Sequence, residues 1–130
     1  MFPDLCYNTH MVNVLLVAVG SALGGVCRYG VSLALNPTSG FPWGTLAVNV
    51  LGSLAIGVLA GALANVSGNA AALRAFAVVG FCGGFTTFST FSNETFRMLG
   101  NSQCGMAVGY VAVSVVAGLA AVALGYFLSR

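Results

Sequence analysis

Charge is almost missing from this sequence. Only 5% of its 130 residues are charged: there is no lysine, and four arginines accompany two acids, Asp4 and Glu94. A soluble domain carries about 25% charged residues, so the composition indicates a membrane protein. A basic patch for nucleic acid and a pair of catalytic carboxylates are both missing. We therefore expect no nucleic-acid partner and no enzymatic activity.

Metal-binding and secretion motifs are also missing. The four cysteines are Cys6, Cys27, Cys82 and Cys104. They show no C-x-x-C spacing, and three lie in or beside apolar runs, where cysteine behaves as a small hydrophobic residue. No basic residue precedes the first apolar run, so we expect no cleavable signal peptide. Residues 1–10 are interpreted as a short extension without readable function.

Long uncharged runs are what the sequence does contain, and 58% of its residues are hydrophobic. A membrane-spanning helix needs about 20 apolar residues. The runs, and the turn-like segments between them, predict four helices over residues 12–35, 44–65, 73–98 and 105–128. Residues 1–130 are therefore expected to form one all-α transmembrane domain.

The third run contains the most informative segment, GFCGGFTTFSTF over residues 80–91. Paired glycines at Gly83-Gly84 each destabilise a helix interior by about 1 kcal/mol relative to alanine. At bilayer depth, carbonyls freed by a break must find partners other than water. We therefore expect the third helix to be broken at Gly83-Gly84, with its freed carbonyls lining a cavity or holding an ion.

Rings and hydroxyls follow the paired glycines. Phe88 and Phe91 are three residues apart and share a helical face. Contact with lipid is the ordinary role of such rings, but the positive edge of a phenyl ring also suits a small anion. The hydroxyl donors of this turn are Thr86, Thr87, Ser89 and Thr90. The combination indicates an anion path.

Three further polar residues have open interpretations. Asn49, in the second helix, can donate to an anion or bond a neighbouring helix, and the helix bond is favoured. Arg28, deep in the first helix, can reach the membrane interface, cap carbonyls or attract anions into a vestibule. Glu94 has Arg97 three residues later, so we expect a surface ion pair at the end of the third helix.

Small residues spaced four apart indicate close helix packing. The pairs are Gly20/Gly24, Gly57/Gly61, Gly80/Gly84 and Gly105/Gly109. Four short spans are expected to leave no cavity of a few hundred cubic ångströms, so a transport path is expected at an oligomer interface. The near-balanced arginines leave two alternatives open, insertion in both orientations or a small bias towards one.

Three segments in the right order resemble the CrcB/Fluc fluoride channel family along nearly the whole chain. They are GGVCRY over residues 24–29, GTLAVNVLG over residues 44–52, and GFCGGFTTFSTFS over residues 80–92, with Glu94 following. The resemblance implies a dual-topology homodimer of antiparallel four-helix subunits in a bacterial inner membrane. It further implies a passive, fluoride-selective channel that exports fluoride from the cytoplasm and confers fluoride resistance.

The resemblance also implies site residues. The expected fluoride pathway is Asn49, Thr87, Phe88, Ser89, Thr90, Phe91, Tyr110 and Ser114. The backbone carbonyls of Gly83 and Thr86 match the positions that hold a structural sodium ion at the dimer centre. Arg28 matches the family arginine of the first helix, as a vestibule or structural residue, and Glu94 is placed in the same class.

Two other classes of protein fit the sequence less well. A proton-coupled exporter like the small multidrug resistance proteins also has four spans, but it needs a carboxylate in its first helix, and none is present here. A purely structural membrane subunit leaves the Gly83-Gly84 pair and its hydroxyl-rich turn unexplained. Fluoride conduction is therefore the predicted function.

Overall fold

The computed structural model describes residues 3–36, 40–64, 66 and 70–130. Every regular element in that part of the chain is a helix. Four helical stretches are long and apolar enough to cross a membrane: Thr9–Leu35, Trp43–Ala62, Ala70–Gly100 and Cys104–Ser129. Their ends lie within a few residues of the predicted ones. The prediction of an all-α chain with four spans is confirmed.

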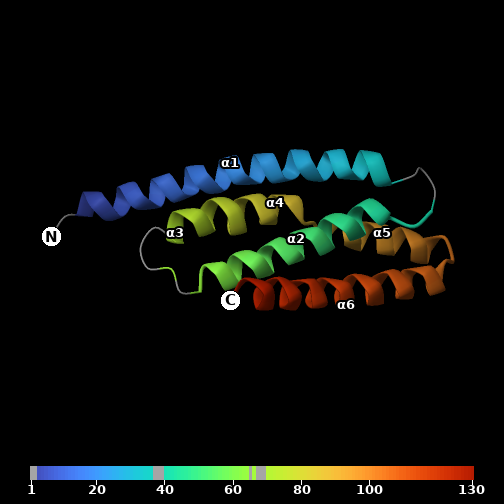
Figure 1. The fold of residues 1–130 in the computed structure, drawn as a ribbon. Helices are drawn as coiled ribbons and strands as arrows, with labels where there is room; N and C mark the ends of the chain where they lie inside the picture. The colour runs from blue at the N-terminus through green and yellow to red at the C-terminus, as the bar shows by residue number, and fades with distance from the viewer. Residues whose placement is uncertain (1–2, 37–39, 65, 67–69) are drawn as a thin grey trace.

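The first helix, α1, runs from Pro3 to Leu35. Its 33 residues extend about 50 Å at about 1.5 Å per residue, well beyond the ~30 Å hydrocarbon core. The N-terminal turns of α1 project past the other helices (Figure 1). The extension assigned to residues 1–10 is therefore, from Pro3 onward, a continuation of the first helix.

The first seam of the fold joins α1 to the start of the third span. This span begins as α3 (Ala70–Leu73), the π-helix η1 (Arg74–Cys82) and the short α4 (Gly83–Phe85). Gly24 faces this stretch so closely that an added Cβ would lie 2.8 Å from the Phe85 nitrogen. A Cβ on Gly84 would lie 2.8 Å from the Cα of Ser21. These glycines let the two backbones touch.

The second seam joins α2 (Trp43–Ala62) to α6 (Cys104–Ser129). A Cβ on Gly57 would lie 3.0 Å from the Tyr126 nitrogen, and one on Gly125 would lie 2.8 Å from the Val58 nitrogen. The predicted pair Gly105/Gly109 differs, because a Cβ there would meet nothing within 4 Å in the described chain. Gly105 and Gly109 therefore make no close helix contact with the described part of the same subunit.

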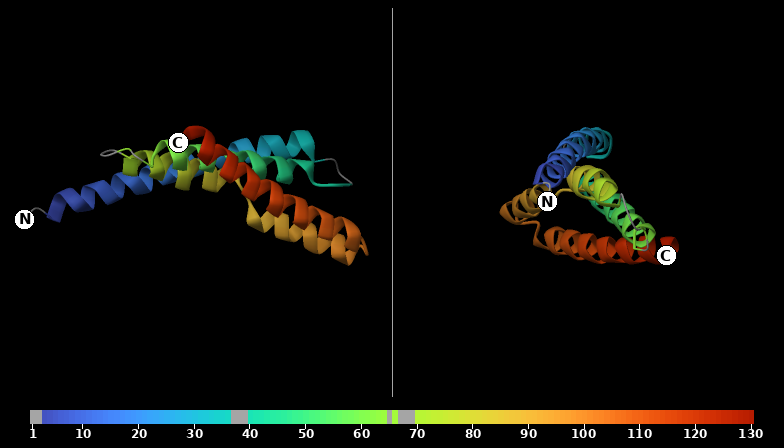
Figure 2. Two further views of the ribbon diagram at one scale, coloured as in Figure 1. Left: turned by 60° about the horizontal axis from the view of Figure 1, so that its bottom comes forward. Right: turned by 90° about the vertical axis from the view of Figure 1, so that its left-hand side faces the viewer.

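The third span bends between its two halves. Its second half, α5 (Phe88–Gly100), turns away from α4 and lies beside α6 (Figure 2). The residues between the halves, Thr86 and Thr87, have extended backbones, with φ/ψ of −78°/158° and −151°/115°. The span therefore changes direction at two threonines.

The predicted position of the break, Gly83-Gly84, is wrong by a few residues. Gly83 has helical dihedrals (φ −64°, ψ −37°), and both glycines belong to α4. Gly84 is needed for the close approach to Ser21, so its small size serves packing. The helix ends where β-branched threonines favour an extended backbone and a side-chain cap is available.

Candidate functional site

The bend is held by one side-chain amide. Asn49 of α2 accepts a hydrogen bond from the backbone N–H of Thr87 at 2.8 Å, and its Nδ2 donates to the Thr87 carbonyl at 3.2 Å. The favoured interpretation of Asn49 as a helix–helix bond agrees with this geometry. Nδ2 carries two hydrogens, and Thr87 uses one of them.

The hydroxyl-rich turn caps α5. Thr87 Oγ1 accepts from the backbone N–H of Thr90 at 3.2 Å, which satisfies one free donor at the start of α5. The same oxygen donates to Thr90 Oγ1 at 3.0 Å and lies 3.4 Å from Ser89 Oγ. Thr86 Oγ1 instead donates back to the Cys82 carbonyl at 2.9 Å. These hydroxyls therefore shape the bend through bonds to one another and to the backbone.

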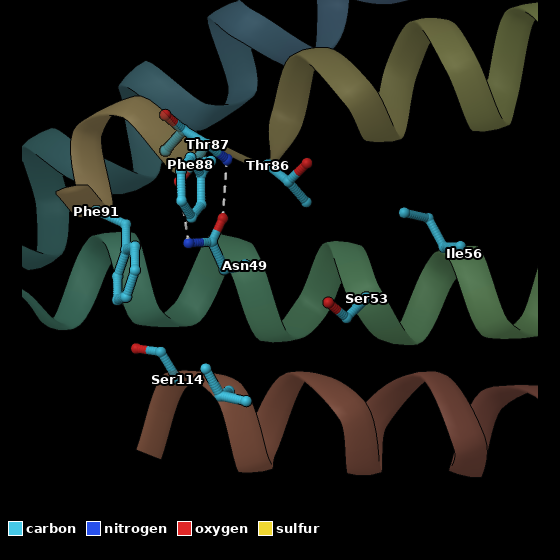
Figure 3. Close-up of a pocket in the computed structure, with 9 residues that line it drawn as sticks. Asn49, Ser53, Ile56, Thr86, Thr87, Phe88, Phe91 and Ser114 are labelled. Atoms are coloured by element: carbon cyan, nitrogen blue, oxygen red, sulfur yellow. Dashed lines mark hydrogen bonds between the residues drawn. The ribbon is translucent and has the colours of Figure 1, made fainter. Parts of the chain in front are cut away.

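An open pocket of about 290 Å³ lies against the bend (Figure 3). Its lining comes from α2, the bend, α5 and α6: Asn49, Ser53, Ile56, Thr86, Thr87, Phe88, Phe91, Ser114 and Val115. One subunit thus has a hollow of this size that is open on one side, and the expected transport path at an oligomer interface stays a prediction. Of the predicted pathway residues, the pocket brings together Asn49, Thr87, Phe88, Phe91 and Ser114. Ser89, Thr90 and Tyr110 lie outside its lining.

The pocket combines apolar rings with spare polar atoms. The Phe88 and Phe91 rings are 5.9 Å apart, centroid to centroid, and tilted by 41°. Phe88 is 80% exposed in the isolated chain. Ser114 Oγ is buried without a hydrogen-bond partner in the described structure. A buried hydroxyl without a partner is costly, so Ser114 has an unused hydrogen-bonding group beside the pocket.

Glu94 is half-buried and bonds two buried hydroxyls, which corrects the prediction of a surface pair with Arg97. Its Oε1 accepts from Thr45 Oγ1 and its Oε2 from the Tyr110 hydroxyl, each at 2.8 Å. Thr45 and Tyr110 are both 0% exposed. Hydrogen bonds to a carboxylate are stronger than those between neutral groups, so Glu94 turns inward while Arg97 stays exposed.

Thr45 and Phe41 were not identified from the sequence. Thr45 precedes Asn49 by four residues on α2, so both lie on one helix face, and that spacing alone marks Thr45 as a candidate. Phe41 meets Tyr110 edge-to-face at 5.3 Å. Tyr110 in turn lies 5.1 Å from Phe91. An aromatic row therefore connects the pocket to Glu94.

The backbone carbonyls at the bend have different partners. In a continuous helix the Gly83 carbonyl would accept from the Thr87 N–H, but that N–H donates to Asn49 Oδ1. In the same way the Thr86 carbonyl would accept from the Thr90 N–H, but that N–H donates to Thr87 Oγ1. Both carbonyls therefore lack their usual helical donor. The Gly84 carbonyl accepts from Arg28 Nε at 3.1 Å, which supports carbonyl capping among the interpretations of Arg28.

Comparison with known proteins gives a consistent result. The family described as "CrcB-like protein, Camphor Resistance (CrcB)" matches residues 15–126. A protein of Methylobacterium sp. (strain 4-46), named fluoride-specific ion channel FluC, is 46% identical over 121 residues, covering 92% of this chain and 98% of its own.

Two further relatives carry the same name. That of Paracoccus denitrificans (strain Pd 1222) is 48% identical over 117 residues, covering 89% of this chain and 93% of its own. That of Nitrobacter winogradskyi is 45% identical over 119 residues, covering 90% and 94%. With the match to the family over nearly all of its apolar length, this chain belongs to the CrcB family.

Proposed function

We propose that this protein is a passive, fluoride-selective channel that exports fluoride from the bacterial cytoplasm and so confers fluoride resistance. The observation that carries the proposal is the pocket at the bend. There two phenyl rings, one side-chain amide and a buried hydroxyl without a partner lie together. The relatives named fluoride-specific ion channel support the choice of ion.

The chemistry of the pocket suits a small, strongly hydrated anion. Ser114 Oγ and the second Nδ2 hydrogen of Asn49 are donors that can replace part of the water around fluoride. The edges of Phe88 and Phe91 add a partial positive potential without a full charge. The pocket lining contains no cationic side chain. A bound anion is therefore held weakly enough to leave again, as conduction requires.

Acid–base chemistry gives such a channel its purpose. Hydrogen fluoride is a weak acid that crosses bilayers as the neutral molecule and ionises in a less acidic cytoplasm, where the anion is trapped. A passive path then lets fluoride leave down its electrochemical gradient. No energy-coupling site is needed for this direction of flow.

The proposed assembly is an antiparallel homodimer with its two-fold axis in the membrane plane, in the bacterial inner membrane. Phe88, Ser89, Ser92 and Asn93 are exposed on α5 in the isolated chain. Three of them are polar, and polar side chains in a span are costly against lipid. A second subunit would cover this face and close the open side of the pocket.

The charge distribution supports dual insertion. Arg74 begins η1 and Arg130 ends the chain, at the end of the bundle that holds both termini, whereas Arg97 lies in the last turn of α5 at the other end, and Arg28 bonds the bend inside the span. Two arginines at one end against one at the other give no clear excess for the positive-inside rule. Either orientation of one subunit is therefore permitted.

A structural sodium ion at the dimer centre completes the proposal. The Gly83 and Thr86 carbonyls have lost their helical donors to Asn49 and to Thr87, and hard cations bind oxygen ligands. Gly83 is exposed in the isolated chain, so its backbone is open to a second subunit. Two carbonyls from each chain would supply four oxygens, and the single positive charge would offset their dipoles.

Fluoride efflux from liposomes that contain the purified protein tests the function, with chloride as the comparison ion. We expect rapid fluoride efflux that follows the electrochemical gradient and chloride efflux near that of empty liposomes. Equal rates for both ions would contradict selectivity. Because Glu94 is a half-buried carboxylate, a second arm imposes a pH gradient without a fluoride gradient, with protein-free liposomes as the control for hydrogen fluoride that crosses the bilayer unaided. Proton-driven fluoride accumulation greater than in that control would favour a coupled transporter instead.

A further inference from the structure

Arg28 has a defined position at the bend of the third span. Among the described residues, it is the only charged side chain that bonds to residues 82–87. It lies four residues after Gly24, so both occupy the same face of α1. Gly24 approaches the backbone of Phe85 so closely that a Cβ would lie 2.8 Å from its nitrogen. The close packing of α1 against α4 at Gly24 therefore places the Arg28 side chain beside the end of α4.

The carbonyls at the end of α4 need donors from elsewhere. The helical run from Ala70 ends at Phe85, and a helix leaves its last carbonyls without internal partners. The Cys82 carbonyl is satisfied locally, by the N–H and the hydroxyl of Thr86, each at 2.9 Å. The Gly84 carbonyl instead accepts from Arg28 Nε at 3.1 Å. Arg28 thus supplies a donor that an unbroken helix would have taken from Phe88.

The charge of Arg28 suits this position as well. A helix C-terminus carries a partial negative charge that a nearby cation stabilises. At bilayer depth no water is available to replace a lost donor. We propose that Arg28 is a positioning residue: its Nε–H holds the Gly84 carbonyl, and so fixes the direction in which the third span turns towards Phe88.

Two roles of Arg28 can be distinguished by substitution: a hydrogen-bond donor at Nε that positions the third span, and a positive charge that attracts anions. Glutamine places its amide nitrogen at the same point of the side chain as Nε, without the charge. Lysine has a carbon at that point and keeps a charge further out. Methionine supplies neither donor nor charge. The three substitutions at Arg28 therefore test the donor and the charge separately.

The first test measures fluoride efflux against fluoride concentration, and this readout rests on the proposed function. Arg28→Gln should keep the maximal rate within about two-fold of wild type, because the donor is retained. Arg28→Met and Arg28→Lys should lower the maximal rate by about ten-fold, the cost of a lost hydrogen bond, at an unchanged half-saturating concentration. Arg28→Lys at the wild-type rate, or Arg28→Gln as slow as Arg28→Met, would overturn the proposal.

The second test does not need fluoride transport. Cys82 is 1% exposed and lies three residues before the end of α4. With the other cysteines, Cys6, Cys27 and Cys104, replaced by serine, a membrane-permeant maleimide should label Cys82 faster in Arg28→Met and Arg28→Lys. In Arg28→Gln the labelling should stay slow. Equal labelling in all three variants would contradict a loosened α4.

A matched control removes another arginine cap. Arg74 Nη2 donates to the Leu63 carbonyl at 3.2 Å, at the end of α2 and away from the bend. Arg74→Met should therefore leave the labelling of Cys82 at its wild-type rate. If Arg74→Met speeds this labelling as much as Arg28→Met does, the effect is general destabilisation, and the proposal fails. If the wild-type protein carries no fluoride, the proposed function fails, while the labelling still decides the role of Arg28.

Discussion

The side-chain amide of Asn49 bonds both backbone groups of Thr87, accepting from its N–H at 2.8 Å and donating to its carbonyl at 3.2 Å. The pair ties α2 to a place where the third span has an extended backbone. Backbone groups freed at bilayer depth have no water to bond. Asn49 therefore replaces the helical partner of the Thr87 N–H, adds a donor to the Thr87 carbonyl, and keeps the wall of the pocket in place.

Replacing Asn49 by aspartate should weaken both the fold and conduction. Asn49→Asp keeps the acceptor for the Thr87 N–H but sets a carboxylate oxygen against the Thr87 carbonyl. We expect a loss of about 1–3 kcal/mol in stability, seen as a lower Tm in detergent, together with slower fluoride efflux from liposomes. Asn101→Asp, which adds the same charge in an exposed turn, is the control. Equal Tm values for the two variants would contradict this role.

The ring edges of Phe88 and Phe91 should matter for flux and not for folding. Phe91→Ile and Phe88→Ile keep apolar bulk beside the pocket and remove the ring edge. Aromatic edge interactions contribute about 0.5–1.5 kcal/mol, so we expect fluoride efflux to slow by roughly three- to ten-fold. The elution volume in size-exclusion chromatography should not change. Unchanged flux in both variants would remove the aromatic rings from the pathway.

Added charge at one end of the bundle should test dual insertion. Asn101 and Gln103 are exposed in the turn between α5 and α6. Lysines at both positions should bias the chain towards one orientation and lower the activity of the singly expressed protein. Co-expression with Val66→Lys, which charges the opposite end, should restore activity. Cysteine-accessibility labelling that finds every wild-type copy in one orientation would rule out the antiparallel dimer.

The turn after α5 offers a stabilising substitution. Ser102 has φ of 61°, a left-handed conformation that favours glycine, and its N–H bonds the Leu99 carbonyl at 3.1 Å. The Gln103 N–H reaches back to the Met98 carbonyl at 2.9 Å, as in a Schellman motif. Ser102→Gly should raise stability by about 1 kcal/mol, measured as a higher Tm. Asn101→Gly, where φ is −90°, should bring no gain.

Apolar run length was enough to predict the four spans, because hydrocarbon thickness sets the length of a spanning helix. The position of the bend was harder to predict. Glycine tolerates both helical and other conformations, so Gly83-Gly84 alone does not decide where a helix ends. The deciding contacts come from far along the chain: Ser21 keeps Gly84 in a close helical seam, and Asn49 captures Thr87.

Glu94 shows the same limit. Local spacing favours a pair with Arg97, but two hydroxyl donors from other helices, Thr45 and Tyr110, turn the carboxylate inward. The roles of the pocket residues in conduction remain predictions. Their shared location is a property of the structure, since α2, α5 and α6 bring Asn49, Phe91 and Ser114 to one pocket.

The proposed sodium site leads to a prediction about its neighbour on α2. A Cβ on Gly52 would overlap Thr86 Cγ2 and lie 3.3 Å from Phe85 Cδ1. Gly52→Ala should therefore push Thr86 aside and displace a proposed ligand carbonyl. We expect this variant to need more sodium than wild type to remain dimeric. Gly118→Ala, whose Cβ would lie an ordinary 3.6 Å from Ser53 Oγ, is the matched control.

Sodium dependence is measured by size-exclusion chromatography and fluoride efflux across a series of sodium concentrations, with a large organic cation keeping the ionic strength constant. The organic cation is too bulky to replace sodium between the carbonyls, and the site has no carboxylate for a divalent ion. The wild-type protein should therefore dissociate or lose fluoride efflux as sodium is removed. Gly52→Ala should show the same loss at a higher sodium concentration. A wild-type dimer that stays fully active after demonstrated removal of all alkali cations would show that the Gly83 and Thr86 carbonyls hold no required ion.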